Sequence, residues 1–146
     1  MHVSNGAKAN VTGSRSLSYD NSALEGGFAY VRGENSTIYV NNGSMINNTK
    51  AYFGGAIFAF DKSFVNFTNA SISTGEAYEG HIMLQTNCTL NMTNGFFNGN
   101  VAHDKGMITA HSNSLVYITN TEFYENEAMH DSLILYIEGA DLDRVL

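Results

Sequence analysis

The sequence predicts an all-β solenoid in which the chain coils through about five rungs of roughly 26 residues, with three short strands in each rung. Three observations lead to this prediction: a repeat of nearly constant length, an alternation of apolar and polar residues within each repeat, and the residue composition. The chain is rich in Val, Ile, Thr, Tyr and Phe and contains no proline. β-branched and aromatic residues favour strands, and proline is confined to their edges and ends.

The repeat is visible in columns of residues that recur at a nearly constant spacing. A small residue or a methionine stands at Ala23, Ala51, Ala77, Ala102 and Met129, at steps of 28, 26, 25 and 27 residues. Similar steps align two apolar columns, which are Val40, Phe67, Met92 and Ile118, and Ile38, Val65, Leu90 and Val116. A period of this length is typical of a solenoid, whose repeats bury their apolar faces only by stacking on one another.

Within a rung, apolar residues alternate with polar ones, which is the period of a strand rather than of a helix. Counted along residues 115–120, Val116, Ile118 and Asn120 share one face. The alternation therefore predicts an interior ladder of Asn42, Asn69, Asn94 and Asn120. In such a ladder each amide would donate to the next, because a buried amide without a partner costs about 1–3 kcal/mol.

Cys88 falls in a column with Ser36, Ser63 and Ser114, two residues before an apolar column. This position predicts a buried, unreactive thiol in place of a serine. Because Cys88 is the only cysteine, the chain can form neither an internal disulfide nor a zinc site made of cysteines.

The repeat divides the chain into three parts. Residues 1–23 form a degenerate N-terminal rung, residues 24–137 the β-helix repeats, and residues 138–146 the end of an incomplete last rung. Solenoids usually need capping repeats over their ends, and the start of the sequence contains no clear cap. We therefore expect self-association, with copies stacked end to end, or contact with neighbouring β-helix domains.

Two short motifs carry a family resemblance. The run Gly54-Gly55-Ala56-Ile57, and the Phe-x-x-Asn pattern at 97–100 and 123–126, resemble the repeats of polymorphic outer membrane proteins and of large protist surface proteins. These belong to the wider class of pectate-lyase-like, right-handed parallel β-helices. The resemblance covers about residues 24–137, although Ile72 and Gly75 depart from the second motif. It implies a right-handed coil and an extracellular or cell-surface protein that acts in adhesion, display or scaffolding, while a minority of the class cleaves polysaccharides.

Asn-x-Ser/Thr sequons occur eight times, whereas the residue composition gives about three by chance. The excess predicts a secreted glycoprotein. The alternative explanation is that strand alternation beside a column of asparagines generates the motif. The candidate glycosylation sites are Asn10, Asn35, Asn47, Asn66, Asn87 and Asn91. Asn42 and Asn69 also begin sequons, but their inward position predicts that they are unmodified.

One polar cluster is a candidate ligand face. His103-Asp104 and His130-Asp131 lie 27 residues apart, so they would stack on adjacent rungs about 5 Å from each other. Stacked imidazoles and carboxylates are able to bind a metal ion or to act as acid and base. A solvated polar turn before a Gly-rich strand is the commoner arrangement, so we assign no metal, cofactor or catalytic residue. None of the arginines (Arg15, Arg32 and Arg144) aligns with this face, unlike in polysaccharide lyases and hydrolases of the class.

Charge and hydropathy narrow the possible functions. The net charge is −7 with only 7 Lys and Arg, which argues against a nucleic-acid partner. No apolar run approaches the ~20 residues of a membrane-spanning helix. We expect a non-catalytic structural or surface-display module. The alternatives are a carbohydrate-active enzyme that uses Asp104 and Asp131, or a carbohydrate-binding adhesin that uses an outward aromatic pair, Tyr39 and Tyr117.

Overall fold

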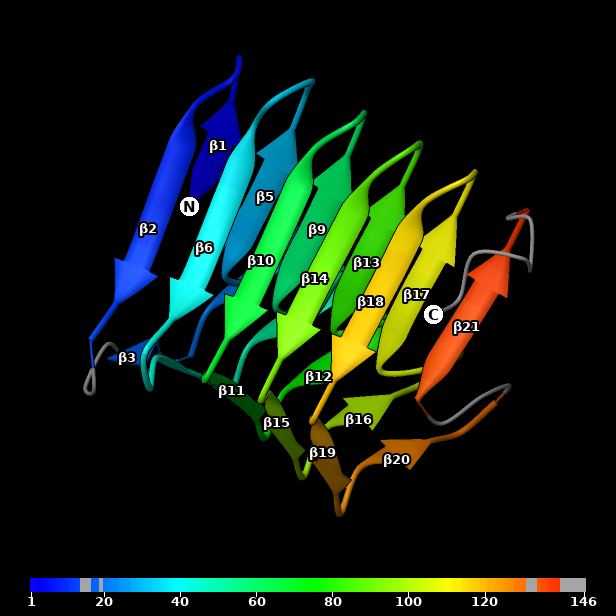
Figure 1. Cartoon of the computed structure of the whole chain (residues 1–146). Helices are drawn as coiled ribbons and strands as arrows, with labels where there is room; N and C mark the ends of the chain where they lie inside the picture. The colour runs from blue at the N-terminus through cyan, green and yellow to red at the C-terminus, as the bar shows by residue number, and fades with distance from the viewer. Residues whose placement is uncertain (14–16, 19, 131–133, 140–146) are drawn as a thin grey trace.

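The structure is a computed structural model that describes residues 1–13, 17–18, 20–130 and 134–139. It confirms the all-β solenoid with a repeat of about 26 residues. In Figure 1 the front sheet runs downward, the back sheet runs upward, and successive turns advance from the N-terminal to the C-terminal end, so the coil is right-handed. The described residues include no helix long and apolar enough to cross a membrane.

Four parallel sheets run along the solenoid, and every pair of neighbouring strands within them is parallel. Sheet A contains β1 (His2–Ser4), β5 (Ala29–Arg32), β9 (Ile57–Phe60), β13 (Ile82–Gln85), β17 (Ile108–His111) and β21 (Leu135–Glu138). Sheet B contains β2 (Lys8–Thr12), β6 (Thr37–Asn41), β10 (Phe64–Thr68), β14 (Thr89–Thr93) and β18 (Leu115–Thr119). Sheet C contains β3 (Leu17–Ser18), β7 (Met45–Asn47), β11 (Ser71–Ser73), β15 (Phe96–Asn98) and β19 (Glu122–Tyr124). Sheet D contains β4 (Ser22–Glu25), β8 (Lys50–Phe53), β12 (Glu76–Glu79), β16 (Val101–Ala102) and β20 (Glu127–Ala128).

The number of strands per turn is four rather than the expected three. The difference arises at the corner between sheets C and D, where a single residue in the left-handed region of φ interrupts what would otherwise be one strand. This residue is Asn48 (φ 48°), Thr74 (φ 53°), Gly99 (φ 61°) and Glu125 (φ 50°) in successive turns. One such residue turns the chain sharply without the run of Gly and Asn that marks a longer loop.

The predicted apolar columns are confirmed in sheet B. Val65 pairs with Ile38 on one side and Leu90 on the other. Val65, Ile38 and Leu90 are all fully buried. The alanine column is also confirmed, except in its last member. Ala102 pairs with Ala128 and not with Met129, because the inward position accepts only a small side chain and Met129 is 53% exposed.

The predicted interior asparagine ladder is wrong about its face. Asn42, Asn69, Asn94 and Asn120 do stack in register, but all four are exposed. Each lies at the corner after sheet B with a φ between 48° and 55°, so the chain turns there and the alternation of the strand no longer applies. The ladder is therefore on the surface, where Asn94 Nδ2 donates to Asn69 Oδ1 at 2.9 Å.

Interior amides occur one corner later, between sheets C and D. Asn100 is fully buried, and its Nδ2 donates to the carbonyl of Ile72 and to Asn126 Oδ1, each at 2.9 Å. Asn126 Nδ2 donates to the carbonyl of Phe97 at 2.9 Å. These are the asparagines of the Phe-x-x-Asn pattern, and they satisfy the backbone where the chain turns inside the core.

Cys88 is buried, as predicted. Its Sγ lies 3.5 Å from Ser63 Oγ, and its backbone N donates to Ser114 Oγ at 3.1 Å. Burial raises the pKa of the Cys88 thiol, so the thiol stays protonated and unreactive.

His81 is a buried titratable residue that the repeat did not predict. Its side chain is fully buried, its Nε2 lies 3.1 Å from the carbonyl oxygen of Val101, and its Nδ1 is buried without a partner. Two glycines make room for the imidazole. A Cβ at Gly55 would lie 2.8 Å from His81 Nδ1, and a Cβ at Gly75 would lie 2.8 Å from His81 Cε1. The ring therefore occupies the place where the next turn has the side chain of Asn100, which explains why Gly75 departs from the Phe-x-x-Asn motif.

Candidate functional site

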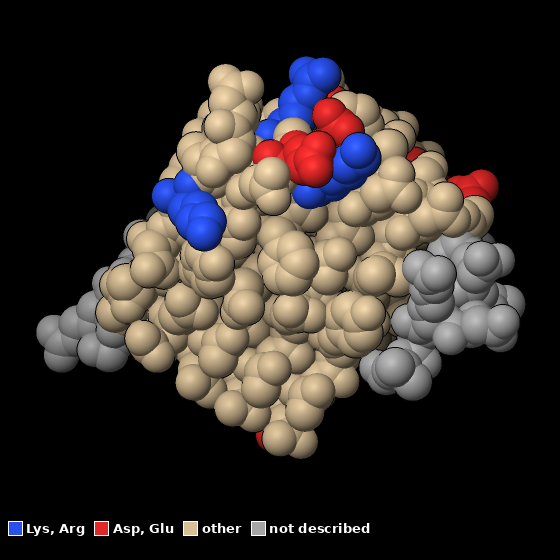
Figure 2. Space-filling view, turned by 45° about the horizontal axis from the view of Figure 1, so that its top comes forward, with Lys and Arg blue, Asp and Glu red and all other residues tan. Residues whose placement is uncertain are grey.

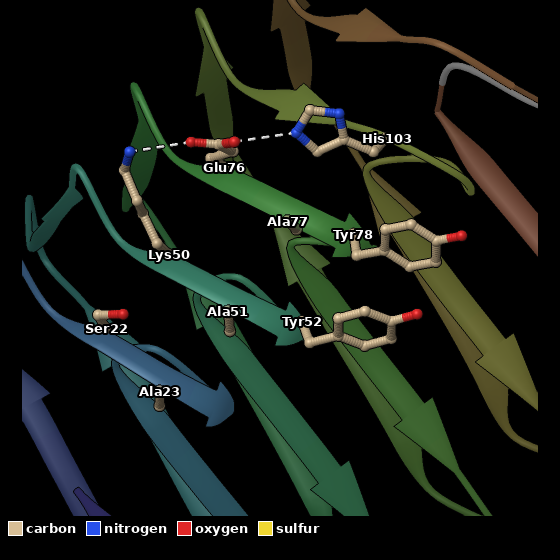
Figure 3. Close-up of a pocket in the computed structure, with 9 residues that line it drawn as sticks. All are labelled: Ser22, Ala23, Lys50, Ala51, Tyr52, Glu76, Ala77, Tyr78 and His103. Atoms are coloured by element: carbon tan, nitrogen blue, oxygen red, sulfur yellow. Dashed lines mark hydrogen bonds and ion pairs between the residues drawn. The ribbon is translucent and has the colours of Figure 1, made fainter.

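The outer face of sheet D contains a shallow groove (Figure 3). Because strands alternate, the alanines of this sheet point inward and two columns point outward. One outward column is Ser22, Lys50, Glu76, Val101 and Glu127, and the other is Leu24, Tyr52, Tyr78, His103 and Met129. Charged and aromatic side chains thus lie beside one another over several turns.

Three side chains of this groove form a chain of polar contacts across consecutive turns. Lys50 Nζ lies 2.9 Å from Glu76 Oε2, and His103 Nε2 lies 3.0 Å from Glu76 Oε1. The hydrogen bonds from Lys50 and His103 lower the pKa of the Glu76 carboxyl. All three side chains are 34–57% exposed, so water screens the pairs and they contribute little to stability.

Tyr52 and Tyr78 stack beside this network. Their ring centroids are 4.4 Å apart with an interplanar angle of 15°, and both hydroxyls point to the same side of the sheet (Figure 3). Desolvation and the neighbouring Tyr78 raise the pKa of the Tyr52 hydroxyl. Because the rings face each other, the surface they offer a ligand consists mainly of ring edges and hydroxyls. Together with Lys50 and Glu76, this surface is suited to hydrogen bonding with a hydroxyl-rich molecule.

The predicted ladder of His103-Asp104 on His130-Asp131 is wrong. The backbone N of Met129 donates to the carbonyl of Ala102, as the backbone N of His103 donates to that of Ala77. Met129 therefore occupies the column of His103, with its Sδ 3.3 Å from His103 Nδ1. His130 is exposed and falls in the register of Asp104, while Asp131 lies outside the described residues. The partner of His103 is Glu76, one turn earlier.

A second polar cluster lies where sheet D meets sheet A, and the sequence did not predict it. His111 Nδ1 lies 3.0 Å from Glu138 Oε2, and His111 Nε2 lies 3.8 Å from Glu79 Oε2. Lys105 Nζ lies 3.5 Å from Glu138 Oε2 and 4.2 Å from the ring centroid of Tyr136. Burial opposes the charge on Lys105, but Tyr136, Glu79 and Glu138 outweigh it and raise the pKa of this ammonium group.

This second cluster brings two carboxylates, an imidazole and an ammonium group together from four different turns. The only trace of it in the sequence is that His111 and Glu138 belong to one column of sheet A. Among the described side chains, no three or more His, Cys, Asp or Glu residues are arranged to hold a metal ion.

The aromatic residues Tyr39 and Tyr117 share an outward column of sheet B, but they are not in contact. Tyr39 pairs with Asn66, Asn66 with Asn91, and Asn91 with Tyr117, so two asparagines separate the rings. Two exposed tyrosines that do stack on each other, Tyr52 and Tyr78, lie on sheet D instead.

The sequon asparagines differ in exposure. Asn10, Asn35 and Asn87 are exposed, Asn66 and Asn91 are half-buried on the outer face of sheet B, and Asn47 is half-buried on β7. The expectation that Asn42 and Asn69 point inward is wrong, because both are exposed at a left-handed corner.

Comparisons of the chain with protein-family models, with curated proteins and with solved structures found no match.

Proposed function

We propose that the chain is a non-catalytic structural or surface-display module of a secreted or cell-surface protein. The observation that carries this proposal is the continuity of the stack. Each of the four sheets is hydrogen-bonded from the first described turn to the last, and the core columns run through it without interruption. Such a rod holds its outer columns at a fixed spacing of about 4.8 Å per turn, which suits a protein that presents surfaces.

The contacts of the reactive groups support the same proposal. Cys88 and His81 are buried in the core, and Glu76 contacts Lys50 and His103 of the two neighbouring turns. Each of these groups has a structural role in joining one turn to the next, so the stack accounts for them without a reaction.

End-to-end association remains part of the proposal, with a geometric condition. Ile118 and Phe123, near the C-terminal end of the described solenoid, are only partly buried, so a neighbouring β-helix domain or a second copy would cover apolar surface there. However, sheet A has six described strands and the other sheets five, so a partner has to accommodate a step of one strand. Sedimentation at increasing protein concentration tests this association, and a chain that stays monomeric contradicts it.

Surface labelling of intact cells tests the display function. A short epitope is inserted between Ser112 and Asn113, two exposed residues with φ of 51° and 62° at a corner of the coil. The corner should accept the insertion without disturbing the strands. We expect antibody to label intact source cells or their culture medium, while a cytoplasmic marker in the same cells is labelled only after permeabilisation. Labelling of the epitope only after permeabilisation would overturn the proposal.

The second polar cluster favours one alternative, a carbohydrate-active enzyme. Glu79 and Glu138 flank His111 and Lys105 in a surface depression, so two carboxylates, the groups that glycoside hydrolases use as acid and base, lie in one place. A screen of neutral and acidic polysaccharides, with and without calcium, tests it. Cleavage that is lost in Glu138→Gln but kept in the matched variant Asp104→Ala would support the enzyme, and no cleavage would remove it.

The stacked tyrosines favour another alternative, a carbohydrate-binding adhesin. Tyr52 and Tyr78 are 45% and 40% exposed beside Lys50 and Glu76, so hydroxyl groups of a sugar find donors and acceptors there. Glycan-array binding that is lost in Tyr78→Ala but kept in Tyr117→Ala would support this site. No binding to any glycan would remove it.

A further inference from the structure

The sequons gather on one side of the solenoid. Asn10, Asn66 and Asn91 point outward from sheet B, Asn35 and Asn87 lie at the corner before it, and Asn42 and Asn69 lie at the corner after it. Only Asn47, on β7 of sheet C, lies apart. Seven of the eight motifs thus belong to one face, whereas sheets A and D contain none.

The strands of sheet B are almost free of charge on this face, and the charged residues lie at the corner before them. The strands β6, β10, β14 and β18 contain no Asp, Glu, Lys or Arg. Figure 2 shows the face as a broad uncharged surface, with the charged side chains gathered along one edge of it. The outward positions of these strands are occupied by Asn, Thr, Tyr, Phe and Leu, so an attached glycan would displace no ion pair from them.

The geometry of the sheet puts both halves of the sequon on the surface. Residues two apart in a strand point to the same side, so Asn66 and Thr68 both face solvent. Thr68 Oγ1 donates to Asn66 Oδ1 at 3.0 Å. The hydroxyl and the amide of the motif are therefore in contact and accessible in the folded protein.

The hydrogen bonds of three sequon asparagines involve the carbonyl oxygen, and not the nitrogen that a glycan uses. Asn66 Oδ1 accepts from Thr68, and Asn69 Oδ1 accepts from Asn94 Nδ2 at 2.9 Å. Asn10 Oδ1 accepts from Asn41 Nδ2 at 3.3 Å. These bonds persist when Nδ2 carries a sugar, because an N-glycosylated amide keeps its carbonyl.

We propose that sheet B and its two corners form a glycan-bearing face, with N-linked glycans on Asn10, Asn35 and Asn87 and on one residue of each stacked pair. The pairs are Asn42 with Asn69, and Asn66 with Asn91. Members of a pair lie on adjacent turns about 4.8 Å apart, which leaves too little room for two glycans. Asn47 is not part of this face, because it lies on β7 of sheet C with its Oδ1 buried, and we expect it to stay bare.

The modification requires an oligosaccharide donor linked to a lipid diphosphate, together with the transferase of the secretory pathway. The asparagine Nδ2 attacks the anomeric carbon of the donor, and an N–C bond forms. The C–O bond to the diphosphate breaks, the lipid diphosphate leaves, and the proton lost from Nδ2 passes to a base of the transferase. The inference rests on the secretion that the proposed function requires.

Such a coat would leave sheet D uncovered. Tyr52, Tyr78 and the Lys50–Glu76–His103 network lie on that sheet, which contains no sequon. A one-sided coat therefore divides the rod into a shielded face and a face that remains available for contact.

The test is expression of the 146-residue chain behind a cleavable secretion leader in eukaryotic cells. Intact mass before and after enzymatic deglycosylation counts the glycans, and peptide mapping locates them as Asn→Asp conversions. We expect glycans at Asn10, Asn35 and Asn87, one on each stacked pair, and none at Asn47. Bare sequons on a secreted, folded chain, or glycans confined to Asn47, would overturn the proposal.

Matched variants test the positions. Asn10→Gln should remove the mass of one glycan, whereas Asn47→Gln should leave the glycan mass unchanged. Asn66→Gln should raise the occupancy of Asn91 if the pair excludes two glycans. Full occupancy of Asn66 and Asn91 together would contradict the pair rule. A bare chain that still reaches the cell surface rejects the glycan coat and leaves the display function standing, so the two failures are distinguishable.

Discussion

Acid should destabilise this solenoid through one buried histidine. His81 is fully buried, and desolvation lowers its pKa to about 4. The imidazole donates from Nε2 to the carbonyl of Val101, whereas its Nδ1 has no partner and is enclosed by Gly55 and Gly75. A second proton on Nδ1 would place a charge in the core with no group to receive it.

The linkage between protonation and folding gives the direction and the size of this change in the free energy of unfolding. In the unfolded chain His81 takes up its proton near pH 6.5, and in the folded chain only near pH 4. The unfolded state therefore binds more protons between these values, so the free energy of unfolding decreases as the pH falls through this window. Above pH 6.5 His81 is neutral in both states, so its titration takes nothing from the free energy of unfolding. By pH 5 about 2 kcal/mol is lost, and by pH 4 about 3 kcal/mol.

The assay is urea unfolding at pH 7.5 and pH 5.0, for the wild type and for His81→Leu. Leucine removes the titration and keeps an apolar side chain of similar volume, although it leaves the Val101 carbonyl without a donor. That loss lowers stability by about 1–3 kcal/mol at both pH values. The pH-dependent loss should be about 2 kcal/mol smaller in the variant. His2→Gln, at an exposed histidine, is the control and should behave like the wild type.

An equal pH-dependent loss in the wild type and in His81→Leu would refute this reasoning. If the leucine variant does not fold, an NMR pH titration of the His81 ring protons in the wild type tests the same point. Their signals should stay those of a neutral imidazole down to about pH 4. A titration of these signals near pH 6.5 would contradict the proposal that burial keeps the His81 ring neutral.

Three further predictions concern backbone and surface. Gly75→Ala should lower the free energy of unfolding by about 1–3 kcal/mol, because the new Cβ meets the His81 ring, and the loss should shrink in a His81→Ala background. A loss of the same size in both backgrounds would exclude the clash with the ring. Thr74→Gly should raise the thermal midpoint, since Thr74 has a φ of 53° and the left-handed region costs a non-glycine residue about 1–2 kcal/mol. A lower midpoint would show that the threonine is not strained. Glu76→Gln should change stability in urea by less than about 1 kcal/mol, because the pair with Lys50 is solvated. A larger loss that persists at high salt would contradict this.

The strands of the fold were predictable, because the apolar columns depend only on a period that the sequence repeats. Val65 and Phe67 pair with the residues that the spacing indicated. The corners were not predictable in the same way. Assigning alternate residues to the two faces of a strand assumes an extended chain. A single residue in the left-handed region, such as Asn69, breaks that alternation, so residues at or beyond it can point to the opposite face. For this reason the asparagine ladder was predicted in register but on the wrong side.

The polar sites were harder to predict because they depend on register across corners. A shift of one residue at the last corner moved Met129 into the column of His103 and removed the expected His103–His130 contact. The cluster around His111 joins residues from separate turns, so its formation depends on how far each corner rotates the chain. The column of Tyr52 and Tyr78 was visible in the sequence, but the parallel stacking of the rings was not.

The stacking of turns explains why the inward columns are restricted to matching apolar side chains while the outer faces of the sheets differ from one another. Each inward column has to match the turns above and below it, as the buried Phe97 does between Ile72 and Phe123. Outward columns have no such requirement, because their neighbours along the rod touch water as well as one another. Sheet B presents a nearly uncharged surface of Asn, Thr and aromatic side chains, while sheet D carries charged side chains and tyrosines. In a solenoid the chemistry of a face is independent of the core, so the differences between its faces are the features that point to function.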